Sequence, residues 1–326
     1  MTEKKINNPD ISIVIPVYGS DSTLINLYVR LVASMVIIPA SFEIIFVDDC
    51  GPGNPWDLIS EMARNDSRVI GIRLTKNFGQ HNAIMAGVDV ARGSWLVIMD
   101  CDLQDRPEEI PRLFKKAQEG YDIVAGQRIN RRDSYFKRLF SRAYHRLFGY
   151  MTNQKSDETQ SSFGIYSRRA VDAVKSLPEQ PRIFPLLVRW FAFKTTAIEI
   201  QHDERTEGKS SYNYDRRLSL AIDTIVSYSE KPLILFIKSG FVMSFAAFCY
   251  GVWLVIRYFI LGQIIAGWTS VMVSMFFLSG VILFGMGVVG VYIGKILNQV
   301  KGRPPYVVNE RTTLSFLCNV FNDEKK

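Results

Sequence analysis

The sequence predicts an α/β domain with a mostly parallel sheet, followed by a hairpin of two membrane-spanning helices. Two observations support this fold class. Short apolar segments alternate with amphipathic segments up to about residue 230, which is the pattern of strand–helix–strand units. After Pro232 two long segments with almost no charge follow, and each approaches the ~20 residues that a helix needs to cross a bilayer.

Five segments of the N-terminal part are predicted to be buried strands, because they are continuous, rich in β-branched residues and bounded by turn residues. The segments between them have helical patterns, so the sheet should be covered on both faces. In such sheets ligands bind beyond the carboxyl ends of the strands. The predicted strands are residues 11–17, 42–49, 68–74, 94–100 and 121–126, and the predicted helices are residues 21–36, 56–65, 79–91 and 107–118.

The predicted hairpin occupies residues 239–256 and about 270–293, and a buried helix pair in a soluble protein is the alternative. Basic residues flank the outer ends of both segments, so the positive-inside rule places both termini in the cytosol. We therefore expect a cytosolic catalytic domain, a juxtamembrane amphipathic helix, two transmembrane helices and a cytosolic tail, at residues 1–212, 213–231, 232–295 and 296–326.

Residues 134–150 have apolar side chains on one helical face and basic side chains on the rest. This pattern is typical of a helix at an anionic membrane interface, and a basic helix packed on its own domain is the alternative. The composition, with 48% hydrophobic and 22% charged residues, excludes a disordered, collagen-like or chromatin-type protein. The four cysteines are far apart and lack a CxxC pattern, which favours a reducing compartment.

Asp100-Cys101-Asp102 follows the fourth predicted strand. Packing does not explain two carboxylates at the end of a strand that is buried on both faces, because unpaired buried charges are costly. A divalent cation between these carboxylates and a diphosphate would explain them, since Mg²⁺ commonly binds one or two carboxylates plus phosphate oxygens. Gln104 offers a further oxygen ligand. A solvated acidic turn before the helix near Pro107 is the alternative.

Asp48 and Asp49 end the second strand, where a carboxylate can accept a hydrogen bond from a base or a ribose. A charged loop is the alternative. Arginine binds phosphate with two parallel hydrogen bonds, so basic residues near the same sheet edge are candidate phosphate ligands, although each is also consistent with a solvated surface charge. These basic candidates are Arg128, Arg131, Arg205 and Lys209.

Gly285–Gly290 matches the GxGxxG pattern but lies inside the second hydrophobic segment. A dinucleotide fingerprint needs a preceding strand, so these glycines are better interpreted as sites of close helix packing. Gly290 and Gly294 form a GxxxG pattern, which has the same meaning in membrane helices.

Together these motifs resemble bacterial polyisoprenyl-phosphate glycosyltransferases of glycosyltransferase family 2, especially undecaprenyl-phosphate glucosyl- and aminoarabinosyl-transferases. Dolichol-phosphate mannose synthase is a more distant relative. The resemblance covers almost the whole chain. It rests on VIPVY (14–18), Asp48-Asp49, NFGQHNAIMAG (77–87), DCDLQDRPEEIPRL (100–113), residues 128–131, ERxxGxS (204–210), the two hydrophobic segments, GVYIGKI (290–296) and RPPYVV (303–308).

The resemblance implies a GT-A nucleotide-sugar domain that uses Mg²⁺ or Mn²⁺ and inverts the anomeric carbon. It assigns catalysis to Asp100 and Asp102. It also assigns nucleotide contacts to Pro16, Tyr18, Asp48, Asn77, Gln80, Asp100 and Cys101, metal binding to Asp100, Asp102 and Gln104, and phosphate binding to Arg128, Arg131, Arg205 and Lys209.

The activity implied is sugar transfer from a nucleotide diphosphate donor to undecaprenyl phosphate at the cytosolic face of the bacterial inner membrane. The product would serve envelope glycan modification, such as that of lipopolysaccharide or O-antigen. The expected partners are the donor, the acceptor and the bilayer, with no nucleic acid, and relatives form homotetramers.

Ser162 and Gly164 stand where many relatives have a proposed catalytic aspartate and an arginine. The acceptor is a phosphate monoester with a second pKa of ~6, so at neutral pH it is mostly a dianion and already nucleophilic. A general base is therefore not strictly required. Asp157 and Glu158 are candidate replacement bases.

Two other functions fit parts of the sequence. A processive polysaccharide synthase would need a Gln-x-x-Arg-Trp motif and more spans, and here Leu186 precedes Arg189-Trp190. Ser210-Ser211 stands where the resemblance implies a Ser-Lys pair. A non-catalytic membrane subunit that binds a nucleotide-sugar or a lipid would fit the departures at Ser162, Gly164 and Ser211.

Overall fold

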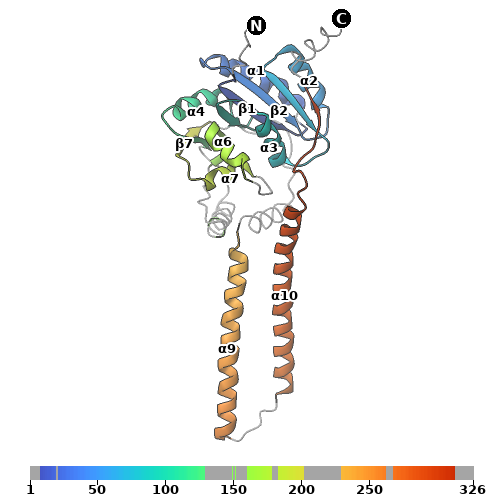
Figure 1. The fold of residues 1–326 in the computed structure, drawn as a ribbon, viewed down its shortest axis with the longest axis vertical. Coiled ribbons are helices and arrows are strands. Elements are labelled where there is room, and N and C mark those ends of the chain that lie inside the picture. The colour runs from blue at the N-terminus through green and yellow to red at the C-terminus, as the bar shows by residue number, and fades with distance from the viewer. Residues whose placement is uncertain are drawn as a thin grey trace. The chain divides into compact units, whose positions relative to one another are not determined.

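The computed structural model describes residues 8–19, 21–128, 149, 151, 160–177, 183–201, 229–261 and 267–312. The chain forms two compact units (Figure 1). The first unit comprises residues 1–133, 158–210 and 304–326, and the second comprises residues 134–157 and 211–303. Residues 134–148 and 213–228, which hold most of the predicted interfacial and juxtamembrane helices, lie outside the described residues.

The first unit contains an eight-stranded mixed sheet with the strand order β7-β5-β6-β4-β1-β2-β3-β8. The strands are β1 (Ile11–Val17), β2 (Phe42–Asp48), β3 (Val69–Leu74), β4 (Trp95–Ile98), β5 (Ile123–Arg128), β6 (Gln160–Ser167), β7 (Thr195–Ile200) and β8 (Val308–Arg311). The helices are α1 (Asp21–Val36), α2 (Pro55–Asn65), α3 (Gln80–Val90), η1 (Pro107–Glu109), α4 (Ile110–Ala117), α6 (Arg168–Lys175) and α7 (Phe184–Trp190).

The predicted α/β class is confirmed, and the predicted strands and helices up to residue 126 all form with small shifts at their ends. The sheet is mixed because β6 runs antiparallel between β4 and β5, and β8 runs antiparallel to β3. β6, β7 and β8 were not predicted from the sequence. β8 consists of four exposed residues at a sheet edge, so no apolar periodicity marks it.

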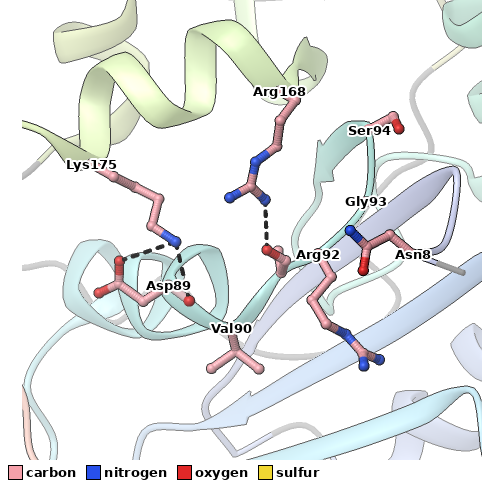
Figure 2. A pocket seen from close by; sticks show the side chains of 9 residues that line it. Asn8, Asp89, Val90, Arg92, Gly93, Ser94, Arg168 and Lys175 are labelled. Atoms are coloured by element: carbon pink, nitrogen blue, oxygen red, sulfur yellow. Dashed lines mark hydrogen bonds and ion pairs between the residues drawn. The ribbon is translucent and has the colours of Figure 1, made fainter. Parts of the chain in front are cut away.

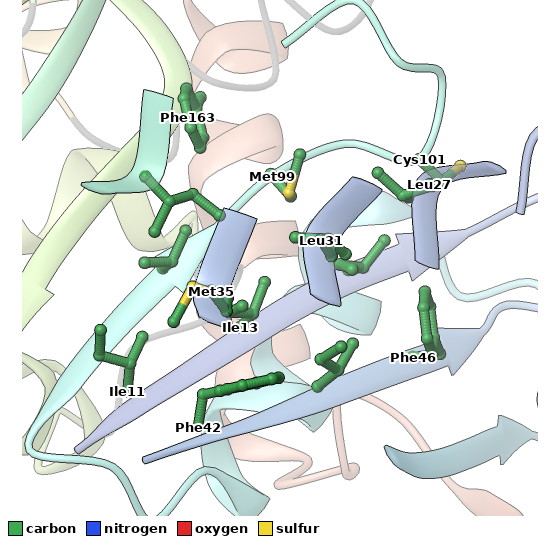
Figure 3. Close-up of a cluster of buried hydrophobic side chains, with 14 of the residues drawn as sticks. Ile11, Ile13, Leu27, Leu31, Met35, Phe42, Phe46, Met99, Cys101 and Phe163 are labelled. Atoms are coloured by element: carbon green, nitrogen blue, oxygen red, sulfur yellow. The ribbon is translucent and has the colours of Figure 1, made fainter. Parts of the chain in front are cut away.

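The core lies on both faces of the central strands. On one face α1 buries Leu27, Leu31 and Met35 against Ile13 and Phe46 (Figure 3). The three α1 residues recur every four positions, which places them on one side of the helix. Full burial of each such side chain contributes about 1.5–3 kcal/mol.

On the other face α3 packs so closely on β1 that a Cβ added at Gly87 would lie 2.4 Å from Cγ1 of Val14. The expected coverage of both faces is therefore present, and every residue of β1 and β2 is buried.

The segment after α10 (Trp268–Val300) belongs to the first unit rather than to a separate tail. β8 pairs with β3, and Figure 1 shows this dark red segment at the edge of the sheet. Thr312 Oγ1 accepts a hydrogen bond from Gly71 N at 2.7 Å, and Thr75 N donates to Val307 O at 3.0 Å. The segment expected to be a tail thus adds an edge strand to the N-terminal domain.

The second unit contains α9 (Lys231–Leu261) and α10, which include the two predicted hydrophobic spans. Both helices are long and apolar enough to cross a membrane, with mean hydropathies of 1.8 and 2.2 in the best stretches, and their side chains are almost entirely exposed. The two helices meet at Phe236, because a Cβ added at Gly285 would lie 2.3 Å from its Cζ.

The expected packing role of the glycines is confirmed at Gly285 only. Within the described chain, apart from the neighbouring residues and backbone of α10 itself, no atom lies within 4 Å of a Cβ built at Gly290 or Gly294. The GxxxG pair therefore does not join α9 to α10.

Candidate functional site

The carboxyl ends of β1 to β4 meet at one edge of the sheet. β1 pairs in parallel with β2 and with β4, and β2 pairs in parallel with β3. The loops that follow these strands therefore lie side by side. This arrangement brings Asp48-Asp49, after β2, to the same edge as Asp100-Cys101-Asp102, after β4.

Asp100 is in direct contact with the start of α3. Gln80, the first residue of α3, donates a hydrogen bond from Nε2 to Asp100 Oδ1 at 2.7 Å. Asp100 is partly exposed and Gln80 is exposed. The fold thus brings together two residues that the family resemblance assigns to the nucleotide.

Burial alternates along the acidic loop. Cys101 and Leu103 are buried, at 8% and 5% exposure, whereas Asp100, Asp102 and Gln104 are partly exposed. The three predicted metal ligands thus keep access to solvent. The Cys101 thiol belongs to the core cluster, so a nucleotide contact from this residue would have to come from its backbone.

Two local interactions shape this loop. Asp102 Oδ1 accepts a hydrogen bond from Gln104 N at 3.1 Å, and Thr23 of α1 donates from Oγ1 to Cys101 O at 3.0 Å. Leu103 has a φ of 61°, a left-handed conformation that is rare for a leucine and marks a tight turn. The loop is therefore held by α1 and by its own turn.

Among the described residues, no group of three or more His, Cys, Asp or Glu side chains could hold a metal ion. The predicted set supplies two carboxylates and one amide oxygen from Asp100, Asp102 and Gln104. This set suits Mg²⁺ or Mn²⁺ if the donor phosphates and water complete the coordination, which is how Mg²⁺ is commonly bound. These three side chains alone would not complete the coordination of such an ion.

Asp48 is buried, with 2% of its surface exposed. Its Oδ1 accepts a hydrogen bond from Cys50 N at 3.1 Å, and Arg73 Nε lies 3.5 Å from its Oδ2. Burial raises the pKa of the Asp48 carboxyl above its ordinary value, and the Arg73 charge opposes this rise.

Asp49 holds a neighbouring loop through hydrogen bonds to its backbone. Its carboxylate accepts hydrogen bonds from Phe78 N at 2.7 Å and from Gly79 N at 2.8 Å. Burial raises the pKa of the Asp49 carboxyl, and these two N–H groups oppose the rise. Asp49 thus fixes the loop that carries the exposed Asn77 and leads into Gln80. The sequence analysis noted Asp49 only for its position after the strand.

Pro16 and Tyr18 lie at the end of β1. Pro16 is buried opposite Val47 of β2, and the pairing of β1 with β4 has already ended at Val14. A proline is tolerated here because β4 no longer needs its missing N–H group. Tyr18 is 52% exposed at the carboxyl edge, where a planar ligand has access to it.

β5 ends at the same edge. Because β6 is antiparallel to both β4 and β5, β4 and β5 run in the same direction, so Arg128 at the end of β5 lies beyond the same side of the sheet. β6 begins there, with Gln160 opposite Gln127, which places the backbone of Ser162 at this edge. The predicted residues Arg131, Asp157, Glu158, Arg205 and Lys209 lie outside the described residues.

Gly164 is tightly enclosed in β6. A Cβ added there would lie 3.0 Å from Val124 O and 3.3 Å from Tyr166 Oη. An arginine at this position, which the family resemblance leads one to expect, would require these neighbours to move. The packing around Gly164 therefore leaves room for a glycine but not for a larger side chain without rearrangement.

A cavity of about 400 Å³ lies at the opposite, amino edge of the sheet (Figure 2). Its basic side chains are already engaged. Arg168 Nη1 donates to Ala91 O at 2.8 Å, Lys175 Nζ donates to Asp89 O at 3.1 Å, and Arg92 pairs with Glu43 at 2.8 Å. Arg168 and Lys175 cap the carboxyl end of α3, so their role is structural.

Comparison with known proteins identifies the family of the chain. Residues 12–174 match glycosyl transferase family 2. The chain is 36% identical over 312 residues to the undecaprenyl-phosphate 4-deoxy-4-formamido-L-arabinose transferase of Proteus mirabilis, covering 95% of each chain. It is 32% identical over 309 residues to an uncharacterised glycosyltransferase of Synechocystis sp., covering 94% of this chain and 97% of the relative.

Among solved structures, glucosyl-3-phosphoglycerate synthase from Mycobacterium tuberculosis, in complex with Mn²⁺, UDP and glucosyl-3-phosphoglycerate, aligns with a TM-score of 0.49 and 15% identity. The alignment covers 67% of this chain and 78% of that one. The family match spans half of the chain, and the curated relatives extend the similarity to nearly all of it. The chain therefore belongs to glycosyltransferase family 2 and is a glycosyltransferase enzyme.

Proposed function

We propose that the protein transfers a sugar, with inversion, from a nucleoside diphosphate donor to undecaprenyl phosphate at the cytosolic face of the bacterial inner membrane. The observation that carries this proposal is the meeting of the two acidic loops at the carboxyl edge, with Gln80 bound to Asp100. The name of the Proteus mirabilis relative supports the lipid phosphate as acceptor.

In this proposal the donor lies across the carboxyl edge. Asp48 accepts a hydrogen bond from the base or ribose, and the exposed Tyr18 borders the same nucleotide. Asp100, Asp102 and Gln104 hold a Mg²⁺ or Mn²⁺ ion. The ion supplies charge neutralisation for the leaving diphosphate.

The acceptor needs little activation. Its phosphate has a second pKa of ~6, so a phosphate oxygen of the dianion attacks the anomeric carbon directly. The bond from that carbon to the donor diphosphate breaks, and the nucleoside diphosphate leaves with the electron pair. Ser162 then has no proton to remove, and the essential task of Arg128, Arg131, Arg205 and Lys209 is to bring two anions together.

The proposed membrane arrangement uses α9 and α10 as spans with both ends in the cytosol. Lys231 and Lys238 lie near the start of α9, Lys295 lies near the end of α10, and Lys301 follows α10 directly. Such a distribution of basic residues favours this orientation. We extend the proposal to the interfacial helix at residues 134–150 and to the boundaries predicted for the domain, the juxtamembrane helix and the two spans up to residue 295. It also includes a homotetramer and a product used in envelope glycan modification.

The two alternatives receive less support. Membership of a family of transferases favours catalysis over a non-catalytic membrane subunit. Only two helices in the described part of the chain are apolar and long enough to span a membrane, which is few for a synthase that exports a long glycan.

The experiment is a transfer assay with the full chain in detergent. Radiolabelled UDP-, GDP- and dTDP-sugars are incubated with undecaprenyl phosphate and Mn²⁺, and butanol-extractable label is counted. We expect label with at least one donor, and a loss of at least about 100-fold in Asp102→Asn, which removes one charge of the cation site. The control Asp172→Asn changes an exposed aspartate on α6 and should keep full activity. A folded protein that labels no lipid with any donor would contradict the proposal.

A further inference from the structure

Three charged residues form a row across β2, β3 and β8. Asp48 lies directly opposite Arg73, and Arg73 lies directly opposite Glu310. Residues that are directly opposite on neighbouring strands project to the same face and interact with each other. The row therefore alternates negative, positive and negative, and it begins at the carboxylate proposed to contact the nucleotide.

Arg73 contacts both carboxylates with different nitrogen atoms. Its Nε lies 3.5 Å from Asp48 Oδ2, and its Nη1 lies 3.4 Å from Glu310 Oε1. The side chains of Arg73 and Glu310 are 35% and 49% exposed, whereas the side chain of Asp48 is 3% exposed. The guanidinium thus spans the boundary between the buried carboxylate and the solvent-facing edge strand.

Glu310 is itself held in place. Trp56 of α2, a buried side chain, donates a hydrogen bond from Nε1 to Glu310 Oε2 at 3.1 Å. The register of β8 shifts beside this position: Val308 lies opposite Leu74 and Glu310 lies opposite Arg73, so Asn309 is an extra residue. Such a bulge re-aims side chains, and here it places Glu310 opposite Arg73.

The row links the donor site to a distant part of the chain. Residues 301–307 alone separate α10 from β8. Without β8, Arg73 would lose its contact to Glu310, and its flexible side chain would leave Asp48 for solvent more readily. A buried carboxylate is costly without a charged or hydrogen-bonding partner, so the position of Arg73 matters for Asp48.

We propose that Glu310 is a positioning residue for the donor site, which holds Arg73 beside Asp48 and makes the strand after the second hydrophobic helix part of nucleotide recognition. The inference rests on the proposed function insofar as Asp48 contacts the nucleotide. It adds a residue outside the segment matched to the family, which ends at residue 174.

Glu310→Gln is the first test, because glutamine keeps an oxygen for Trp56 and removes the charge that holds Arg73. Binding of UDP, GDP and dTDP, each with Mg²⁺, is measured by calorimetry on the full chain in detergent. For the nucleotide that the wild type binds, we expect Kd to rise about threefold to fivefold, the range for a partly exposed ion pair. In the transfer assay KM for the matching donor should rise while kcat and the acceptor KM stay constant.

Two controls separate positioning from a general structural effect. Glu119→Gln breaks another exposed ion pair, with Lys116 at the end of α4, and should leave nucleotide binding unchanged. In an Arg73→Gln background, Glu310→Gln should add no further loss of affinity, because Glu310 acts through Arg73.

The inference is overturned if Glu310→Gln binds nucleotide like the wild type, or if its effect persists undiminished in the Arg73→Gln background. It is also overturned if the wild type binds none of the three nucleotides. A wild type that binds nucleotide but transfers no sugar contradicts the proposed function alone. Normal transfer with unchanged binding in Glu310→Gln contradicts the inference alone.

Discussion

Gln80 donates a hydrogen bond to Asp100 at 2.7 Å, which joins the first residue of α3 to the acidic loop after β4. The contact orients the carboxylate with a neutral amide. A neutral partner leaves the carboxylate available to a cation, as the proposed function requires. Gly79, with a φ of 91°, allows the sharp entry into α3 that brings Gln80 to this place.

Replacement of Gln80 by alanine should lower kcat/KM for the donor about tenfold, since a hydrogen bond to a charged group contributes roughly 1.5–3 kcal/mol. The Mn²⁺ concentration for half-maximal activity should rise as well, because Asp100 loses its orientation. Gln118→Ala, an exposed glutamine after α4, is the control. Unchanged kinetics in Gln80→Ala would show that the contact has no role in transfer.

Replacement of Asp49 by alanine should destabilise the first unit. It leaves the N–H groups of Phe78 and Gly79 without their acceptor, at a cost of about 1–3 kcal/mol for each group that water does not reach. Thermal unfolding of the full chain in detergent measures the loss. Asp49→Asn keeps one acceptor oxygen and should fall between the wild type and alanine. Equal melting temperatures of wild type and Asp49→Ala would contradict this role.

Replacement of Asp48 by asparagine should stabilise the fold while weakening nucleotide binding. Burial raises the pKa of Asp48 in the folded state, so the native protein favours the protonated form. The protonated Asp48 carboxyl therefore stabilises the folded state at pH values below its ordinary pKa of 3.8. This stabilisation is lost as pH rises through the pKa of the folded state. Asp48→Asn does not titrate, so it should unfold at a higher temperature than the wild type at pH 7.5.

The difference between the two melting temperatures should shrink as pH falls toward the ordinary pKa of 3.8, and each kcal/mol corresponds to about 2–4 °C for a domain of this size. A scan of melting temperature against pH checks this, with nucleotide affinity measured in parallel. A lower melting temperature of Asp48→Asn at pH 7.5 would mean that the ion pair with Arg73 outweighs the cost of burial.

Replacement of Gly285 by leucine should disturb the α9–α10 hairpin, because its Cβ would meet the Phe236 ring. Overpacking of this kind costs about 1–3 kcal/mol. Gly290→Leu is the matched control, since the described chain leaves its Cβ position open. Thermal unfolding in detergent should separate the two variants, and equal behaviour would show that α9 and α10 do not pack at Gly285.

Much of the first unit follows from local pattern. Continuous apolar runs such as residues 11–17 have to be buried on both faces, so β1 and its neighbours are recognisable without knowledge of the rest. The carboxylates of Asp100 and Asp102 also stand out locally, because they follow such a run. The α9 and α10 helices are visible from length and apolarity alone.

Only the tertiary structure decided which distant residues meet. Neither the contact of Gln80 with Asp100 nor the caps from Asp49 can be inferred from spacing, since each depends on the order of strands in the sheet. The same holds for β8, whose exposed residues carry no periodic signal and whose pairing with β3 is made by backbone hydrogen bonds. A hydrophobic pattern is a local property of a sequence. Which segment pairs with a sheet edge depends on where the chain returns in space, so the contact of Glu310 with Arg73 could be found only in the tertiary structure.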